Sequence, residues 1–286
     1  MRHLTLTLLA TAVLAVGVPA VALGDDPGTG QIPPPHPILT FIDRTPMVEL
    51  SDGGAGLPYL GSPTSYNAGD WENALRVFHD SGVYDTELGQ IDAIAQKWVA
   101  RFVHAGAHER SYARKLHARR HASKRFHGKR VRAATLHGHK LAIVLDVDET
   151  SLSNYSAINA DNFTFGPNSQ AEATNKIGIA IKPTLDLFNL AKAQGVAVFF
   201  ITGRREAVRQ PTTENLQAQG FKDWDGLILK PDASTQTTVA YKSGARASIE
   251  QQGYRIIANV GDQYSDLAGR HEDKAFKLAN PFYFLP

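Results

Sequence analysis

The stretch LAIVLDVDET, residues 141–150, decides the fold class of this chain. Its first half is a short apolar run, the pattern of a buried strand, and its second half is mainly acidic. Two later apolar runs, residues 196–201 and 254–260, also end in polar groups. Because these runs alternate with helical patterns, we predict an α/β fold in which helices cover both faces of a parallel sheet.

Other segments complete this pattern. Apolar residues recur at three- and four-residue steps along several of them, which predicts helices. The expected helices are Trp71–His79, Tyr84–Ala105, Pro183–Ala193 and Tyr241–Gln251, and two more strands are expected at Leu227–Leu229 and Ala275–Leu278. The chain has 286 residues, 43% of them hydrophobic, which is enough to bury a substantial core.

Four acids follow the predicted strands. On extended backbone, residues two apart point to the same side, roughly 6–7 Å apart, so Asp146 and Asp148 should enter the crevice where parallel sheets bind ligands. Asp262, and Asp266 one helical turn later, are expected at the same edge. Gathered carboxylates repel each other unless a cation lies between them or one stays protonated. Because the ligands are oxygen atoms and the chain has no cysteine, we expect Mg²⁺.

The same crevice should also receive groups that bind phosphate. Thr202 ends the second strand, backbone N–H groups surround Gly203, and a lysine, either Lys230 or Lys242, comes from the units that follow. A hydroxyl, N–H groups and an ammonium can together hold phosphoryl oxygens opposite a metal. The motif Asp-x-Asp-x-Thr alone recurs by chance, and receiver domains of two-component signalling gather similar groups. The order of all these motifs along the chain is the more specific signal.

These motifs resemble those of the haloacid dehalogenase (HAD) superfamily. The runs that carry the resemblance are Leu145–Asn154, Ile201–Arg204, Tyr241–Ser243 and Asn259–Leu267. Within the superfamily the chain is most similar to the acid phosphatase branch, which includes bacterial class C and plant vegetative-storage-type acid phosphatases. The resemblance covers about residues 84–286. It implies a Rossmann-like HAD fold with a small cap at about residues 155–181.

The resemblance implies a role for each acid. Asp146 would be the nucleophile that attacks phosphorus and forms an aspartyl-phosphate. Asp148 would protonate the leaving alkoxide and then accept a proton from the attacking water. Asp146, the backbone carbonyl of Asp148, and Asp262 would hold Mg²⁺, and Asp266 would support them as a neighbour of the ligands.

The resemblance also implies that Thr202, Gly203 and Lys242 bind the phosphoryl group. A Lys-Ser pair at the head of the helix before the last long strand matches the family's arrangement, which favours Lys242 over Lys230. Certain plant relatives have lost the first aspartate and serve as storage proteins, so the presence of Asp146 favours an active enzyme. Aromatic residues of the cap could stack on a leaving group or pack the cap itself, and the substrate's leaving group stays open.

The N-terminal half, residues 1–140, is predicted to lie outside the core at residues 141–286. Residues 1–24 have the pattern of a secretory signal peptide, with an uncleaved membrane anchor as the alternative. Residues 25–70 are rich in Pro and Gly and predict an extended tether or wrapping segment that is not a folded unit, followed by a helical extension at 71–140. We therefore expect a secreted or cell-envelope protein without a membrane span after signal removal. Without cysteine it has no disulfide and no lipid-modified cysteine.

Basic charge is concentrated in His108–Lys140. This segment holds 11 Lys/Arg against one acid, together with six of the 11 histidines, whereas the whole chain has a net charge of only +2. We predict that it is helical to about Phe126. It is either a solvated helix face or a contact for polyanions, including anionic substrates. Nucleic-acid binding is disfavoured because its only aromatic residues are Tyr112 and Phe126.

The sequence therefore predicts an exported, Mg²⁺-dependent acid phosphatase that hydrolyses small-molecule phosphate monoesters. The alternative is a non-catalytic protein of the same fold, either polyanion-binding or of the storage type, in which the acid cluster holds a structural cation.

Overall fold

The structure, a computed structural model, describes residues 35–51, 72–118 and 133–285. The predicted signal peptide, much of the Pro/Gly-rich segment and part of the basic segment lie outside the described residues. Within the described ranges, no helix combines the length and the apolar character that a bilayer span needs.

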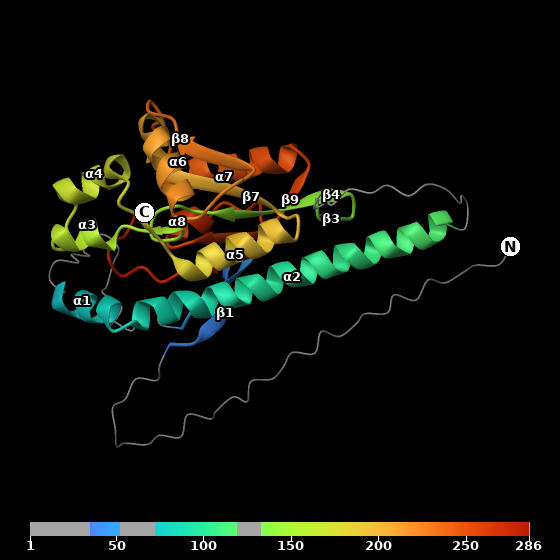
Figure 1. Ribbon diagram of the computed structural model, residues 1–286, viewed down its shortest axis with the longest axis horizontal. Coiled ribbons are helices and arrows are strands. Elements are labelled where there is room, and N and C mark those ends of the chain that lie inside the picture. Colours follow the sequence, from blue (N-terminus) through green and yellow to red (C-terminus); the bar gives the residue numbers. More distant parts are fainter. Residues whose placement is uncertain (1–34, 52–71, 119–132, 286) are drawn as a thin grey trace, which may run out of the picture. The chain divides into compact units, whose positions relative to one another are not determined.

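The core is a parallel sheet, as predicted. Strand β4 (His139–Leu145) lies at its centre, between β9 (Tyr254–Gly261) and β7 (Ala197–Arg205), and all three run in the same direction. Strands β8 (Gly226–Lys230) and β10 (Ala275–Lys277) extend the parallel sheet beyond β7 and β9 (Figure 1). The mixed α/β fold with a mainly parallel sheet is confirmed.

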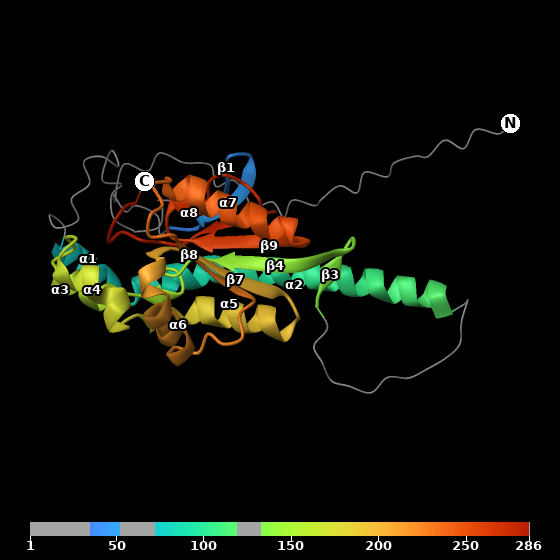
Figure 2. The same cartoon turned by 90° about the horizontal axis from the view of Figure 1, so that it is seen from above.

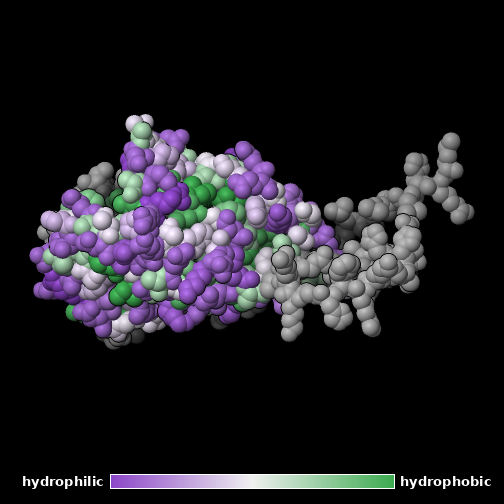
Figure 3. All heavy atoms as spheres, turned by 45° about the horizontal axis from the view of Figure 1, so that its top comes forward, coloured by the Kyte–Doolittle hydropathy of each residue, from purple (hydrophilic) through white to green (hydrophobic). Residues whose placement is uncertain are grey.

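Alternate side chains of β4 pack on opposite faces of the sheet. Ile143 and Leu145 join a hydrophobic cluster with helices α2 (Val83–Ala118) and α5 (Lys182–Ala193). Ala142 and Val144 join a second cluster with α7 (Thr238–Gln251) on the other face. Most apolar side chains are buried. The face of the molecule seen in Figure 3 is mainly hydrophilic and is interrupted by patches of hydrophobic residues. This alternation directs the next even-numbered residue, Asp146, toward the α7 face.

A hairpin within the expected tether is a correction to the sequence analysis. Strands β1 (Pro37–Ile42) and β2 (Thr45–Leu50) pair with each other, and β2 adds in parallel to β10 through Met47 and Val48. The prediction of an extended, unfolded segment is wrong for these residues. The two strands are rich in apolar and β-branched residues, and Met47, Val48 and Leu50 are buried, but the Pro and Gly of the surrounding sequence concealed this strand signal.

Several shorter elements complete the fold. The basic segment continues α2 as far as Ala118, and its end forms β3 (Thr135–Leu136), which pairs antiparallel with β4. After β7 come the 3₁₀ turn η2 (Glu206–Val208) and the helix α6 (Arg209–Ala218). Helix α6 was not predicted because its sequence, RQPTTENLQA, carries little apolar periodicity.

A cap follows the first motif. It comprises α3 (Tyr155–Ala160), α4 (Pro167–Asn175) and the two-stranded sheet of β5 (Leu152–Ser153) with β6 (Ile179–Ala180). Helix α1 (Glu72–Asp80) lies at the same end of the sheet as the cap, beyond the carboxyl end of β4, as both views show (Figures 1 and 2).

A buried acid lies between α2 and α5. Asp92 of α2 is fully buried, and its Oδ2 accepts a hydrogen bond from the Thr184 hydroxyl of α5 at 2.9 Å. Its Oδ1 has no hydrogen-bond partner among the described residues. Burial raises the pKa of Asp92 from 3.8 to about 7, because the charged form loses its hydration.

We expect Asp92→Asn to stabilise the protein above pH 7. The folded state keeps the Asp92 proton up to about pH 7, whereas the unfolded chain loses it near pH 4, so the wild type loses stability as pH rises between these values. The variant does not have this loss, which is on the order of 4 kcal/mol, because asparagine does not ionise. The free energies of unfolding of the two proteins should therefore become equal below pH 4. Denaturant unfolding from pH 4 to pH 8 measures the difference. The exposed Asp85→Asn is the control, and a pH-independent difference for Asp92→Asn would contradict the assignment.

Candidate active site

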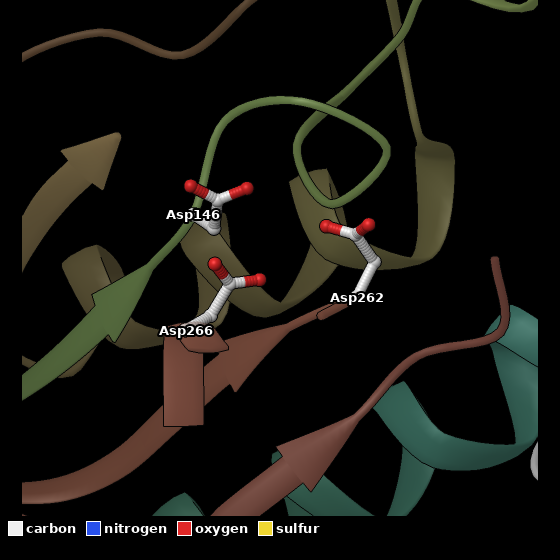
Figure 4. A group of neighbouring side chains, drawn as sticks. All are labelled: Asp146, Asp262 and Asp266. Carbon is white, nitrogen blue, oxygen red and sulfur yellow. The ribbon is translucent and has the colours of Figure 1, made fainter. Parts of the chain in front are cut away.

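A buried lysine joins two of the predicted acids. Asp146 follows β4 on the α7 face, where Lys242 stands in the first half of α7. Lys242 Nζ lies 2.5 Å from Asp146 Oδ1 and 2.6 Å from Asp266 Oδ1. Oxygens of Asp146, Asp262 and Asp266 all lie within 4.8 Å of one another, and Figure 4 shows the three carboxylates grouped together. The structure thus brings Asp146 together with two acids that lie more than a hundred positions later in the chain.

Asp266 is held by the turn that follows β9. It lies in the short helix α8 (Tyr264–Leu267), where its Oδ2 accepts a hydrogen bond from the Gln263 backbone N–H at 2.8 Å. Gly261 makes this approach possible, since a Cβ there would lie only 2.5 Å from the Asp266 Cβ. The glycine of the Gly-Asp motif therefore has a steric role in addition to ending the strand.

Arg246 ties the same turn to α7. Its guanidinium donates to the backbone carbonyls of Asp266 at 2.6 Å, of Arg270 at 2.8 Å, and of Ala268. It also lies 2.8 Å from a carboxylate oxygen of Glu272, and both side chains are fully buried. Because Lys242 and Arg246 lie one turn apart on α7, one helix fixes both the side chain and the backbone of Asp266. The sequence analysis did not identify Arg246, and a lone arginine in an amphipathic helix gives no signal for it.

Asp262 is surrounded by hydrogen-bond donors. The Thr150 hydroxyl donates to its Oδ1 at 2.9 Å, and the amides of Gln263 and Asn280 each donate to its Oδ2 at 2.7 Å. Thr150 is the last residue of the Asp-x-Asp-x-Thr motif, so the first and last motifs are joined directly. This contact explains why a hydroxyl residue fits that position.

Asp148 lies apart from the three clustered acids and binds an arginine. Arg204 contacts both of its carboxylate oxygens, with Nη2 2.6 Å from Oδ1 and Nε 2.9 and 3.1 Å from Oδ1 and Oδ2. Asn154 donates to Oδ1 at 2.8 Å. Burial alone would raise the pKa of Asp148, but Arg204 and these hydrogen bonds outweigh it and lower the pKa. The sequence analysis gave Arg204 no role, although its position two residues after Thr202 on one strand could have indicated it.

The residues expected to bind phosphate occupy different positions relative to the cluster. Thr202 was expected to end its strand but lies buried within β7, which continues to Arg205, and its hydroxyl lies 3.5 Å from Asp148 Oδ2. Gly203 is exposed, and a Cβ there would meet no atom within 4 Å, so the space above it is open. Lys242 is in the cluster, whereas Lys230 is turned to the Gln236 carbonyl at 2.6 Å.

The electrostatics of the cluster fit a hard divalent cation. Burial raises the pKa of Asp146 well above its usual range, opposed by Lys242 and reinforced by Asp266. Burial and the charge of Asp266 raise the pKa of Asp262 to about 6. For Lys242, burial lowers the pKa but the two carboxylates raise it more. Two of the three carboxylates thus share the Lys242 ammonium, and a cation bound by oxygens of all three would favour their ionised forms.

Comparisons with known proteins agree with this geometry. A family model described as HAD superfamily, subfamily IIIB (acid phosphatase), matches residues 80–286. Acid phosphatase 1 of Solanum lycopersicum is 37% identical over 148 residues, which are 50% of this chain and 58% of the relative. Vegetative storage protein 1 of Arabidopsis thaliana is 41% identical over 103 residues, 36% of this chain and 38% of the relative. The matches therefore span roughly four- to six-tenths of these relatives.

A solved structure supports the fold. The class C acid phosphatase from Bacillus anthracis superposes with a TM-score of 0.52 at 16% identity, over 76% of this chain and 86% of that one. At this identity the likeness concerns the fold alone. The family model covers well over half of the chain. The chain belongs to the acid phosphatase family of the HAD superfamily, subfamily IIIB.

Proposed function

We propose that this protein hydrolyses phosphate monoesters through a phosphorylated aspartate, Asp146. The observation that carries the proposal is the buried cluster in which Lys242 bridges Asp146 and Asp266 beside Asp262. The open space above Gly203, next to Thr202, leaves room for a phosphoryl group. Membership of the acid phosphatase family supports the same reaction.

The first step transfers the phosphoryl group to the protein. An Asp146 carboxylate oxygen attacks phosphorus, and the bond between phosphorus and the ester oxygen breaks. Asp148 must be protonated for this step, which the negative charge of the bound phosphoryl group favours against the effect of Arg204, and it gives that proton to the departing alkoxide. Lys242, the Thr202 hydroxyl and the Gly203 N–H hold the phosphoryl oxygens and stabilise the charge that develops on them. Because Lys242 already lies 2.5 Å from Asp146, its positive charge is in place before the substrate arrives.

The second step releases phosphate. Asp148, now ionised, accepts a proton from a water molecule while the water oxygen attacks phosphorus. The bond between phosphorus and Asp146 breaks, which regenerates the free carboxylate and liberates inorganic phosphate. Arg204 stabilises the ionised Asp148 that exists between the two steps, since it contacts both carboxylate oxygens.

The proposed cofactor is Mg²⁺. Asp146, the backbone carbonyl of Asp148, and Asp262 would hold it, and Asp266 would support them while bound to Lys242. When bound, the ion supplies Lewis-acid stabilisation of the phosphoryl oxygens. Oxygen-only donors, and an all-carboxylate cluster among the described residues, favour a hard cation over zinc or copper.

A non-catalytic role is the alternative, since relatives of this chain include proteins named for storage. Asp146 and Lys242 are both present and in contact here, which favours the enzyme. Export through residues 1–24 and polyanion contact through residues 108–140 are further proposals that rest on the sequence pattern. An acidic pH optimum for hydrolysis is a further proposal, which rests on the family resemblance.

We expect Asp146→Asn to abolish turnover. The amide cannot act as the nucleophile, and loss of a nucleophile lowers the rate on the order of 10⁴-fold or more. Hydrolysis of p-nitrophenyl phosphate at pH 4–8 with Mg²⁺ measures this, with the exposed Asp232→Asn as a control that should keep wild-type activity. Full activity of Asp146→Asn would refute the assignment of Asp146 as the nucleophile. A wild-type protein without activity across this pH range would favour the non-catalytic alternative.

Removal of the metal should also stop the reaction. Treatment with EDTA should abolish activity, and Mg²⁺ should restore it. Mg²⁺ should also raise the melting temperature of the wild type, because an ion at 100 times its Kd adds about 2.7 kcal/mol of stability. Asp262→Asn should lose most of this thermal shift. An equal shift in both proteins would place the ion outside the proposed site.

A further inference from the structure

The start of the cap helix touches the proposed general acid. Asn154 directly precedes α3, and its side-chain amide donates to Asp148 Oδ1 at 2.8 Å. Its backbone N–H donates to the buried Glu149 carboxylate at 2.6 Å. The position of α3 therefore sets the position of a donor to Asp148.

Helix α1 holds the far end of α3. Arg76 Nε donates to the Asn159 side-chain carbonyl at 2.7 Å, and its Nη2 donates to the Asn162 side-chain carbonyl at 2.8 Å. The guanidinium also lies over the Phe163 ring, 5.6 Å from its centroid. The Glu72 carboxylate, one turn earlier on α1, accepts a hydrogen bond from Arg76 Nη2 at 3.1 Å and orients the guanidinium. A planar guanidinium thus reaches two amides and a ring of the cap at once.

The same helix also holds the near end of α3. The His79 ring stacks on the Tyr155 ring, with centroids 3.4 Å apart and planes 5° apart. Tyr155 is the first residue of α3 and the neighbour of Asn154. Phe282 packs against this pair, with its centroid 5.2 Å from that of Tyr155. Both ends of the short helix are therefore fixed by residues of α1.

We propose that α1 is a positioning element for the reaction: Arg76 and His79 hold α3, and α3 holds Asn154 against Asp148. This inference rests on the proposed function. Three donors among the described residues contact the Asp148 carboxylate: Arg204 and, at 3.5 Å, Thr202 from the sheet, and Asn154 from the cap. Without the cap contact, only the two sheet residues orient the carboxylate, and we expect the acid to face the leaving oxygen less well. Arg76 and His79 precede residues 80–286, which the family model matches. The contacts of α1 with α3 therefore involve residues of the N-terminal extension.

The test compares leaving groups. If Asp148 is misaligned, hydrolysis slows most for esters with basic leaving groups, such as glycerol 2-phosphate. Hydrolysis of p-nitrophenyl phosphate slows less, because p-nitrophenolate leaves without a proton. We expect Arg76→Ala to lower kcat roughly 10-fold or more for the alkyl ester and less than about 3-fold for the aryl ester. Asn154→Ala should show the same selective loss. Arg76→Lys should recover part of the alkyl-ester rate, because an ammonium can still reach one of the two amides.

The control is Arg101→Ala, an exposed arginine of α2 over Trp98, which should change neither rate. Hydrogen exchange on the full-length protein adds a readout that is independent of activity: Arg76→Ala should accelerate exchange in residues 154–163 and Arg101→Ala should not. Asn162→Gly removes one exposed contact of Arg76 without straining the positive φ of 52° at this residue, and it serves if Arg76→Ala does not fold.

The outcomes separate this inference from the proposed function. Equal losses for both esters, or unchanged exchange in residues 154–163, would overturn the positioning role of α1. A wild-type protein inert toward both esters would overturn the phosphatase proposal, and with it the inference that rests on it. Selective loss for the alkyl ester together with faster exchange supports both.

Discussion

The buried contact of Lys242 with Asp146 and Asp266 is the constraint on which the site depends. Carboxylates removed from water repel one another strongly unless a cation lies among them or one of them is protonated. The ammonium lies 2.5 and 2.6 Å from the two acids, with each of the three side chains at most 7% exposed. Removing one partner of such a contact typically costs about 3–5 kcal/mol, because the other charge is left buried and unpaired.

The surrounding residues keep this cluster in register. Strand β4 directs Asp146 toward α7, Gly261 leaves room for Asp266, and Arg246 ties the backbone of Asp266 to the helix that carries Lys242. Thr150 joins the first motif to Asp262. The cluster therefore joins the end of β4, helix α7 and the end of β9. These three elements are far apart along the chain but adjacent in the folded protein.

Much of this arrangement could be predicted from the sequence because it depends on local patterns. Short apolar runs identify the buried strands, and the two-residue period places Asp146 and Asp148 at the same strand end. The carboxyl ends of parallel strands then share one edge, which predicts that Asp262 and Asp266 lie near Asp146. The residues alone leave Lys230 and Lys242 open. The resemblance to the family favours Lys242, and the structure puts it in the cluster.

Contacts between distant segments could not be predicted in the same way. The hairpin at residues 37–50 is stabilised by pairing with β10, more than two hundred residues later, so the Pro and Gly content of the surrounding segment was misleading. Arg204 stood in a quoted motif, but only the fold shows that it binds Asp148. The contacts of α1 with the cap involve an arginine and two asparagines, which carry no periodic signal.

The central claim is that Asp146 and Asp262 share one divalent ion beside Lys242. Anomalous diffraction from crystals grown with Mn²⁺ in place of Mg²⁺ tests it most directly, because the signal locates the ion independently of its ligands. The account predicts one strong peak bonded to oxygens of both aspartates, with the Lys242 ammonium close by. A peak elsewhere, together with an empty cluster that keeps its side-chain positions, would contradict it.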